Sequence, residues 1–221
     1  MSTSSALVAQ PNADVAPLEQ LSTRGAMDGD SWVSIQNEVS QCTACPLHQG
    51  RQQTVFGVGD IAANWLIVGE APGAEEDRKG EPFVGRAGQL LDSMLAALGV
   101  TRNDVFITNV VKCRPPSNRD PKTEEMTACA SYLDRQIEFI KPQLILAVGR
   151  VAAHRLLDTD APLGRLRGQV HEYQALTSEG DVSIPVVATY HPAYLLRSPS
   201  QKRKAWEDLV FAQQWSPPKS T

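Results

Sequence analysis

The stretch Trp65-Leu66-Ile67-Val68-Gly69-Glu70-Ala71-Pro72-Gly73 decides how the rest of the chain is interpreted. Its first four residues are apolar and predict a buried strand. The segment that follows, as far as Gly88, is rich in glycine, proline and carboxylates, and an amphipathic helix is expected from about Ala87. Glycine lets a backbone approach a ligand closely, and a connection of this length in a compact domain is usually functional. The simpler interpretation is a solvated acidic loop.

Further apolar runs predict more buried strands, separated by helical patterns. Apolar strands that alternate with helices are typical of an α/β fold with helices on both faces of a parallel sheet. We therefore expect a three-layer α/β/α arrangement with a mainly parallel central sheet of about four strands. The three further runs are Val105–Val111, Leu144–Gly149 and Ile184–Thr189, and another strand is possible near Val170–Tyr173.

The composition is that of a globular protein, with 42% hydrophobic and 21% charged residues in 221. We expect one folded domain over residues 31–214, a disordered tail over 1–30 and a short tail over 215–221. No apolar run has the length of a membrane span, and the N-terminus lacks the features of a signal peptide. The sequence thus predicts a cytoplasmic protein without membrane contact.

The formal net charge of −4 argues against a strongly basic nucleic-acid binder. The charge is unevenly distributed, however, because basic residues outnumber acidic ones from Lys141 onward. A local basic surface can bind a phosphate backbone whatever the total charge of the chain. Net charge therefore does not exclude DNA as a partner.

Four cysteines suggest a metal site. In a cytoplasmic protein two disulfides are not expected, and a Cys-x-x-Cys pair with two further thiols matches the ligand count of a four-thiolate site. Zinc and an iron–sulfur cluster both use such ligands, and a single Cys-x-x-Cys pair favours the cluster mildly. Alternatively, the two later cysteines are ordinary core residues. The four are Cys42, Cys45, Cys113 and Cys129.

Polar residues follow or end three of the predicted strands. The glycine-rich segment follows the first, Asn109 lies near the end of the second, and His191 follows the last. In parallel sheets these carboxyl ends meet at one edge, where ligands bind. This convergence predicts a binding site formed by residues far apart in the sequence.

Three motifs together resemble the family 4 uracil-DNA glycosylases, which are prokaryotic base-excision-repair enzymes with a [4Fe–4S] cluster. They are Gly-Glu-Ala-Pro-Gly-x-x-Glu-Asp from Gly69 with Pro-Phe-Val-Gly from Pro82, Thr-Asn-Val-Val-Lys-Cys-Arg-Pro-Pro from Thr108, and His-Pro-Ala-Tyr-Leu-Leu-Arg from His191. The resemblance covers about Ile35 to Phe211. It implies hydrolysis of the N-glycosidic bond of uracil in DNA, giving free uracil and an abasic site, without a lyase step.

The resemblance assigns roles that the chemistry supports. Phe83 would stack on the flipped uracil, and the Asn109 amide would pair with N3–H and O4 and reject cytosine. His191 would donate to O2 of the leaving uracil, where negative charge develops. Backbone N–H groups around Glu70 and Ala71 would add donors, and Glu70 would orient water, stabilise the sugar cation or only shape the loop. The catalytic residues expected are thus Glu70, Asn109 and His191, with Glu76 near uracil C5 excluding thymine.

The resemblance also implies which residues contact DNA and which hold the cofactor. The cations expected at the mouth of the pocket are Lys112, Arg114, Arg119 and Arg197. Leu195 and Leu196 could fill the gap left by the flipped nucleotide, although core packing would also explain at least one of them. By motif, Cys42, Cys45, Cys113 and Cys129 would hold one structural [4Fe–4S] cluster, with zinc as the alternative.

Two other function classes remain open at this point. A non-catalytic sensor of damaged DNA would use the same pocket without releasing product. An iron–sulfur electron carrier would be reduced reversibly and would ignore uracil in DNA. We expect a monomer that acts on single- or double-stranded DNA containing uracil.

Overall fold

The computed structural model describes residues 31–177 and 180–215. The two expected tails lie outside these residues, except that Trp215 ends the last helix. No helix in the described ranges has both the length and the apolar character needed to cross a membrane. In chain order the elements are α1 (Trp32–Gln41), η2 (Pro46–Gln49), β1 (Val58–Gly59), β2 (Trp65–Gly69), α2 (Ala74–Lys79), α3 (Arg86–Ala97), β3 (Phe106–Asn109), η3 (Pro116–Asn118), α4 (Thr123–Ile140), β4 (Leu144–Val148), α5 (Arg150–Leu157), α6 (Leu163–Leu166), β5 (Val170–Thr177), β6 (Gly180–Thr189), α7 (Pro192–Arg197), η4 (Pro199–Gln201) and α8 (Lys202–Trp215).

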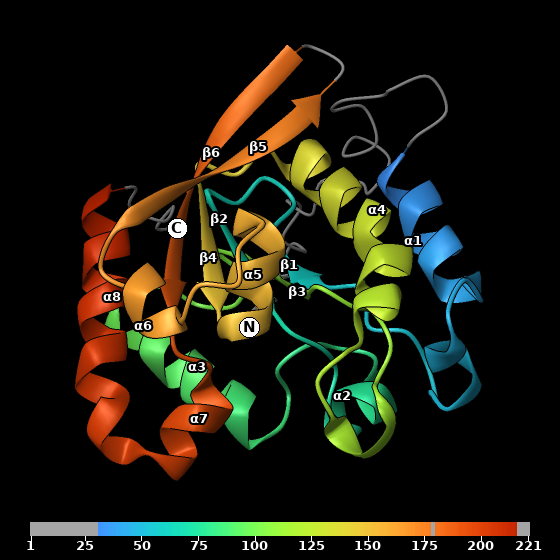
Figure 1. Ribbon diagram of the computed structural model, residues 1–221, viewed down its shortest axis with the longest axis horizontal. Helices are drawn as coiled ribbons and strands as arrows, with labels where there is room; N and C mark the ends of the chain where they lie inside the picture. Colours follow the sequence, from blue (N-terminus) through green and yellow to red (C-terminus); the bar gives the residue numbers. More distant parts are fainter. Residues whose placement is uncertain (1–30, 178–179, 216–221) are drawn as a thin grey trace, which may run out of the picture.

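The strands form one sheet in the order β1-β3-β2-β4-β6-β5 (Figure 1). The four central strands are parallel to their neighbours, whereas the edge strands β1 and β5 pair antiparallel with β3 and β6. The α/β class and the mainly parallel sheet are therefore confirmed.

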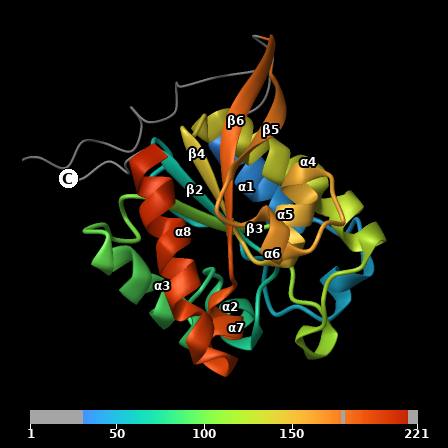
Figure 2. The ribbon, with the colours of Figure 1, turned by 60° about the vertical axis from the view of Figure 1, so that its left-hand side comes forward.

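The sheet has six strands where the sequence predicted about four. β1 contains only two residues, too few to produce a recognisable pattern. β5 is the strand that was considered possible near Val170, and it extends to Thr177 in a hairpin with β6. The far end of this hairpin projects beyond the other strands in both ribbon views (Figures 1 and 2). At this end residues 180–183 of β6 are exposed, so an apolar signal is not required of them.

Helices cover both faces of the sheet, as the alternation of its side chains requires. Leu66 and Val68 of β2 belong to the core that packs against α4 and α5, whereas Trp65 and Ile67 belong to the core beneath α3 and α8. All four side chains are fully buried. Figure 2 shows α3 and α8 on one side of the strands and α4 and α5 on the other.

The long segment after β2 contains a short helix, α2, which the sequence analysis read as irregular loop. Three acidic residues occupy its first turn, Arg78 and Lys79 its last turn, and Gly80 follows with φ +79°. This charge order suits the helix dipole, and glycine suits the left-handed residue after a helix. The helix is too short to give an apolar period, so only its ends could have revealed it.

The connections place a crevice at the carboxyl ends of the central strands. From β2 the chain passes through α3 to β3 on one side, and from β4 it passes through α5 to β6 on the other. Loops that leave neighbouring strands in opposite directions open a gap between them, which is where α/β proteins bind ligands. Gly69 ends β2 directly beside Asn109 of β3, and Val148 lies beside Thr189 of β6.

Candidate active site

A cleft of about 410 Å³ lies at this edge of the sheet. A volume of this order suits a single small ring with its attached sugar. The cleft brings together the loop after β2, the end of β3, the loop after β3 and the start of α7. The expected site residues on its wall are Glu70, Ala71, Glu76, Phe83, Asn109, Arg119, His191 and Arg197.

Two glycines set the positions of Phe83 and Asn109. A Cβ atom added at Gly69 would lie 2.5 Å from Oδ1 of Asn109 and 2.6 Å from the Phe83 ring. A Cβ added at Gly88 would lie 1.7 Å from the Phe83 carbonyl oxygen. None of these three distances is possible for a real side chain, so glycine is what allows the amide and the ring to lie over the end of β2.

Phe83 is held in an unusual conformation. Its φ is +54°, which a bulky residue adopts only when its surroundings enforce it. Arg102 provides part of that enforcement, because its guanidinium donates to the carbonyl oxygens of Phe83 at 2.9 Å and Pro82 at 2.6 Å. It also pairs with Asp92 at 3.0 Å. The ring of Phe83 is thereby fixed before any ligand binds.

Glu76 clamps the loop instead of presenting free oxygens to the cleft. Its Oε1 accepts from the backbone N–H groups of Val84 and Gly85, each at 2.9 Å. Its Oε2 accepts from the N–H of Gly73 at 3.1 Å. The expected exclusion of thymine by Glu76 would therefore come from a carboxylate already engaged by the loop.

His191 is positioned as a neutral donor. Its Nδ1 accepts from the N–H of Ala193 at 3.1 Å and so caps α7, which leaves the proton on Nε2. Burial and then the Arg197 guanidinium lower the pKa of His191 to about 4, against a smaller effect of Glu76. The His191 ring stacks on the Phe83 ring with centroids 5.5 Å apart and planes at 28°.

The segment before His191 is anchored from behind. Thr189 donates its hydroxyl to Oδ2 of buried Asp208 at 2.7 Å, and Arg167 donates to the same oxygen at 2.7 Å. The Arg167 guanidinium also lies 4.3 Å from the centre of the Tyr190 ring. This network ties the end of β6 to α8 and limits the movement of His191.

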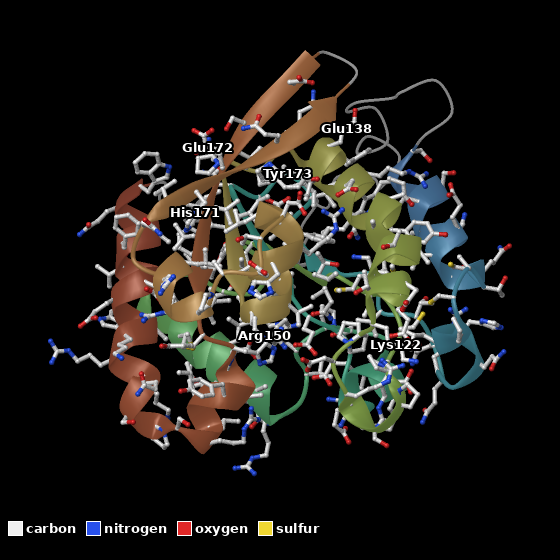
Figure 3. All side chains as sticks on the ribbon, in the orientation of Figure 1. Lys122, Glu138, Arg150, His171, Glu172 and Tyr173 are labelled. Atoms are coloured by element: carbon white, nitrogen blue, oxygen red, sulfur yellow. The ribbon has the colours of Figure 1, made fainter. Side chains whose placement is uncertain are left out.

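Glu70 belongs to a group of charged side chains that the sequence analysis did not identify. Burial first, and then the negative charge of Asp120, raise the pKa of Glu70 to about 7, and a hydrogen bond between the two side chains adds to the effect. Arg150 opposes it, and its guanidinium pairs with Asp120. Figure 3 shows Arg150 at the start of α5, on the side of the molecule where α2 and α7 lie. Only the fold brings these three residues together.

The structure corrects one of the expected DNA contacts. Lys112 is 1% exposed and its ammonium points into the protein, so it cannot reach a phosphate. Arg119 lines the cleft and pairs with Glu125 through two hydrogen bonds, of 2.8 and 2.6 Å. Arg114 donates to Asn118 at 2.8 Å, and Arg197 is exposed on the cleft wall. Three of the four cations therefore remain available to DNA.

The two adjacent leucines of α7 differ. Leu195 is 1% exposed and belongs to the interior, whereas Leu196 is 37% exposed. Leu195 therefore cannot act as a wedge without leaving the core. Leu196 and Tyr194, which is 36% exposed, are the apolar side chains that α7 presents to solvent.

All four cysteines are free thiols that line one small cavity between α1, the loop after β3 and α4. Arg51 donates to Sγ of Cys113 at 3.1 Å and to the carbonyl oxygen of Cys42 at 2.8 Å. The N–H of Ala44 lies 3.5 Å from Sγ of Cys42. In the described part of the chain no three His, Cys, Asp or Glu side chains are placed to hold a metal ion. The four thiols thus share one cavity.

An aromatic platform, an amide and a neutral imidazole around one cleft define a site for a planar ring that forms hydrogen bonds at its edge. The chain belongs to the uracil DNA glycosylase superfamily, whose family model matches residues 56–210. This confirms the resemblance found in the sequence.

The similar proteins include two type-4 uracil-DNA glycosylases. The enzyme of Pyrobaculum aerophilum is 45% identical over 176 residues, which cover 78% of this chain and 88% of the relative. That of Archaeoglobus fulgidus is 46% identical over 182 residues, covering 80% and 89%. A type-5 uracil-DNA glycosylase of Pyrobaculum aerophilum is 34% identical over 152 residues, covering 62% and 64%.

Proposed function

We propose that this chain is a monofunctional glycosylase that flips uracil out of DNA, hydrolyses its N-glycosidic bond and so starts base-excision repair. The observation that carries the proposal is the placement of Asn109, Phe83 and neutral His191 around one cleft, with Gly69 making room for the first two. A base must leave the stack before its glycosidic bond can be reached, and the cleft has the size for one base.

Recognition rests on Asn109 and Phe83. The amide of Asn109 can accept from uracil N3–H and donate to O4, a pair of contacts that cytosine cannot make. Asn109 ends a buried strand, and a Cβ added at Gly69 would lie 2.5 Å from its Oδ1, so the amide lies close against the end of β2. A base stacked on Phe83 would meet this amide at its edge.

Cleavage rests on His191 and Glu70. Nε2–H of His191 would donate to O2 of uracil as negative charge develops there, and a neutral imidazole makes no ion pair with the ground-state base. Glu70, once ionised, would orient water or stabilise the cationic sugar, and backbone N–H groups near Ala71 would add donors.

The DNA strand would run over the mouth of the cleft. Arg114, Arg119 and Arg197 would contact phosphates, and Leu196 would enter the gap left by the flipped nucleotide. We place the activity in the cytoplasm, where prokaryotic DNA lies, and expect a monomer.

The test uses an oligonucleotide with one uracil and measures abasic-site formation. Asn109→Ala should lower uracil excision by a factor of about a hundred or more, since a fixed donor and acceptor are lost. Asn37→Ala, at an exposed amide of α1, is the matched control and should behave as wild type. Tight binding of uracil-containing DNA without product would instead favour a damage sensor, and indifference to uracil would favour an electron carrier.

For the four thiols we propose one [4Fe–4S] cluster held by Cys42, Cys45, Cys113 and Cys129. Their placement around one cavity, with a guanidinium and an N–H directed at two of the sulfurs, fits a thiolate-bound cluster. When bound it would supply a cross-link between α1, the loop after β3 and α4. Brown protein containing iron and sulfide would support this, whereas colourless protein with one zinc would favour the alternative.

A further inference from the structure

Lys112 is the most unusual buried group outside the cleft. Its ammonium donates three hydrogen bonds, to Oγ1 of Thr108 at 2.8 Å, to the carbonyl oxygen of Asn109 at 2.8 Å and to Oε1 of Gln136 at 2.6 Å. An ammonium has three donors, so all of them are used. A side chain held in this way has a fixed position.

All three acceptors are neutral, which leaves the charge of Lys112 unbalanced. Among the described residues, the ion pairs that we identify do not include Lys112. Asp134 acts on it only at longer range. A buried cation without a counter-charge is costly, and such groups are kept where an opposite charge lies close.

The missing negative charge has a source nearby. Lys112 lies on the wall of the cavity that the four cysteines line, next to Cys113 in the chain and close enough to Cys129 for an electrostatic interaction. Four thiolates outweigh the positive charge of an iron–sulfur core, so a bound cluster would be net negative. The ammonium would then lie beside an anion.

The same ammonium supports the base-selecting end of β3. It holds the main chain of Asn109, whose side chain lines the cleft. Its partner Gln136 donates to the carbonyl oxygen of Phe56 at 3.0 Å, and Thr108 donates to that oxygen at 2.8 Å. These contacts connect β3 to α4 and to the segment before β1.

We propose that Lys112 is a positioning residue that couples the four-thiol site to the base-selecting residue Asn109. The cluster supplies the negative charge that keeps the ammonium in place, and the ammonium fixes the main chain of Asn109. This inference rests on the cluster proposed above. It gives the cluster a function in the glycosylase that requires no electron transfer.

The test replaces Lys112 with Met, which has similar length and no charge, and compares it with Lys122→Met. Lys122 is exposed at the start of α4 (Figure 3). Lys112→Met should release iron to a chelator about tenfold faster and lower single-turnover uracil excision by about tenfold or more. Its cluster should also have a lower reduction potential, because loss of a nearby cation disfavours the more negative reduced state. Lys122→Met should match wild type in all three measurements.

The proposed coupling would be overturned if Lys112→Met matched wild type in all three measurements: the rate of iron release, the reduction potential and the rate of uracil excision. If Lys112→Met does not fold, Gln136→Leu replaces it, since this change removes one acceptor and keeps the cation. Gln136→Leu should keep the potential and lower excision severalfold; unchanged excision would overturn the proposal. Wild-type protein that excises uracil but contains zinc would refute the cluster itself, a result separate from those of the variants.

Discussion

The cleft and the four-thiol site are built in different ways. The cleft is held by hydrogen bonds of the protein itself, from Glu76 and Arg102 to the Phe83 loop and from Asp208 to the end of β6. At the thiol site, the Arg51 guanidinium donates to Cys113 and the N–H of Ala44 is directed at the sulfur of Cys42. The first site is therefore preorganised by the chain, and the second, on our proposal, is completed by a cluster. Substitutions at the two sites should therefore have different effects on uracil excision and on iron release.

The largest effect should come from His191→Asn. Asparagine is a good N-cap, so the start of α7 should survive while the imidazole donor is lost. Uracil excision should fall by about a hundredfold or more, with thermal stability close to that of wild type. The matched control is His171→Asn in β5, whose ring contacts the Leu166 carbonyl oxygen and lies outside the cleft lining. Activity within a few-fold of wild type in His191→Asn would remove His191 from the catalytic residues.

Arg51→Ala should weaken the thiol site and leave the cleft intact. Its guanidinium joins the Cys42 and Cys113 segments, so its loss should speed iron release about tenfold. Protein that still contains iron should excise uracil at nearly the wild-type rate, because the hydrogen bonds of the Arg51 guanidinium go to Ser40, Cys42 and Cys113. Arg78→Ala, at an exposed ion pair in α2, is the control. Equal iron release in both variants would contradict the role of Arg51.

The pH dependence of excision should report Glu70. Its pKa is raised to about 7, so the ionised form and the rate should increase as the pH rises through 7. His191, with a pKa lowered to about 4, should stay neutral over this range. Asp120→Asn removes a negative charge beside Glu70 and should move the midpoint about half to one unit lower, whereas Arg150→Gln should move it higher. A midpoint that neither change moves would mean that another group titrates.

The smallest effect on catalysis should come from Leu196. Leu196→Ala removes an exposed side chain and should lower excision from duplex DNA severalfold more than excision from single strands, since only the duplex leaves a gap to fill. Leu195→Ala, in the core, should instead lower the free energy of unfolding by about 2–5 kcal/mol. Chemical denaturation and excision assays on both variants check this contrast. If Leu196→Ala lowered excision from duplex and from single-stranded DNA equally, Leu196 would not act as a wedge.

Much of the fold and of the site could be predicted because both depend on local patterns. Fully buried strands such as β2 and β4 are continuous apolar runs, and strand ends in a parallel sheet meet at one edge. This was sufficient to predict that Asn109 and His191 lie close together. Short or partly exposed elements were missed, because two residues in β1 and six in α2 are too few to establish a period.

Individual contacts were less predictable. Arg102 donates to the carbonyl oxygen of Phe83. Asp120 raises the pKa of Glu70 and Arg150 lowers it. No spacing in the sequence connects these residues. One signal was present for Arg150, which stands at the start of a helix directly after a predicted strand. Arg51 offered only the signal of lying near the Cys-x-x-Cys pair.

The sequence by itself determined the α/β class, the family and the edge of the sheet that carries the site, because apolar periodicity and short motifs are local properties. Only the tertiary structure decided that Lys112 turns inward, that Leu195 is core while Leu196 is exposed, and that Glu76 clamps its own loop. The direction of a side chain depends on partners distant in the sequence. For Lys112 these include Gln136, 24 residues away on α4.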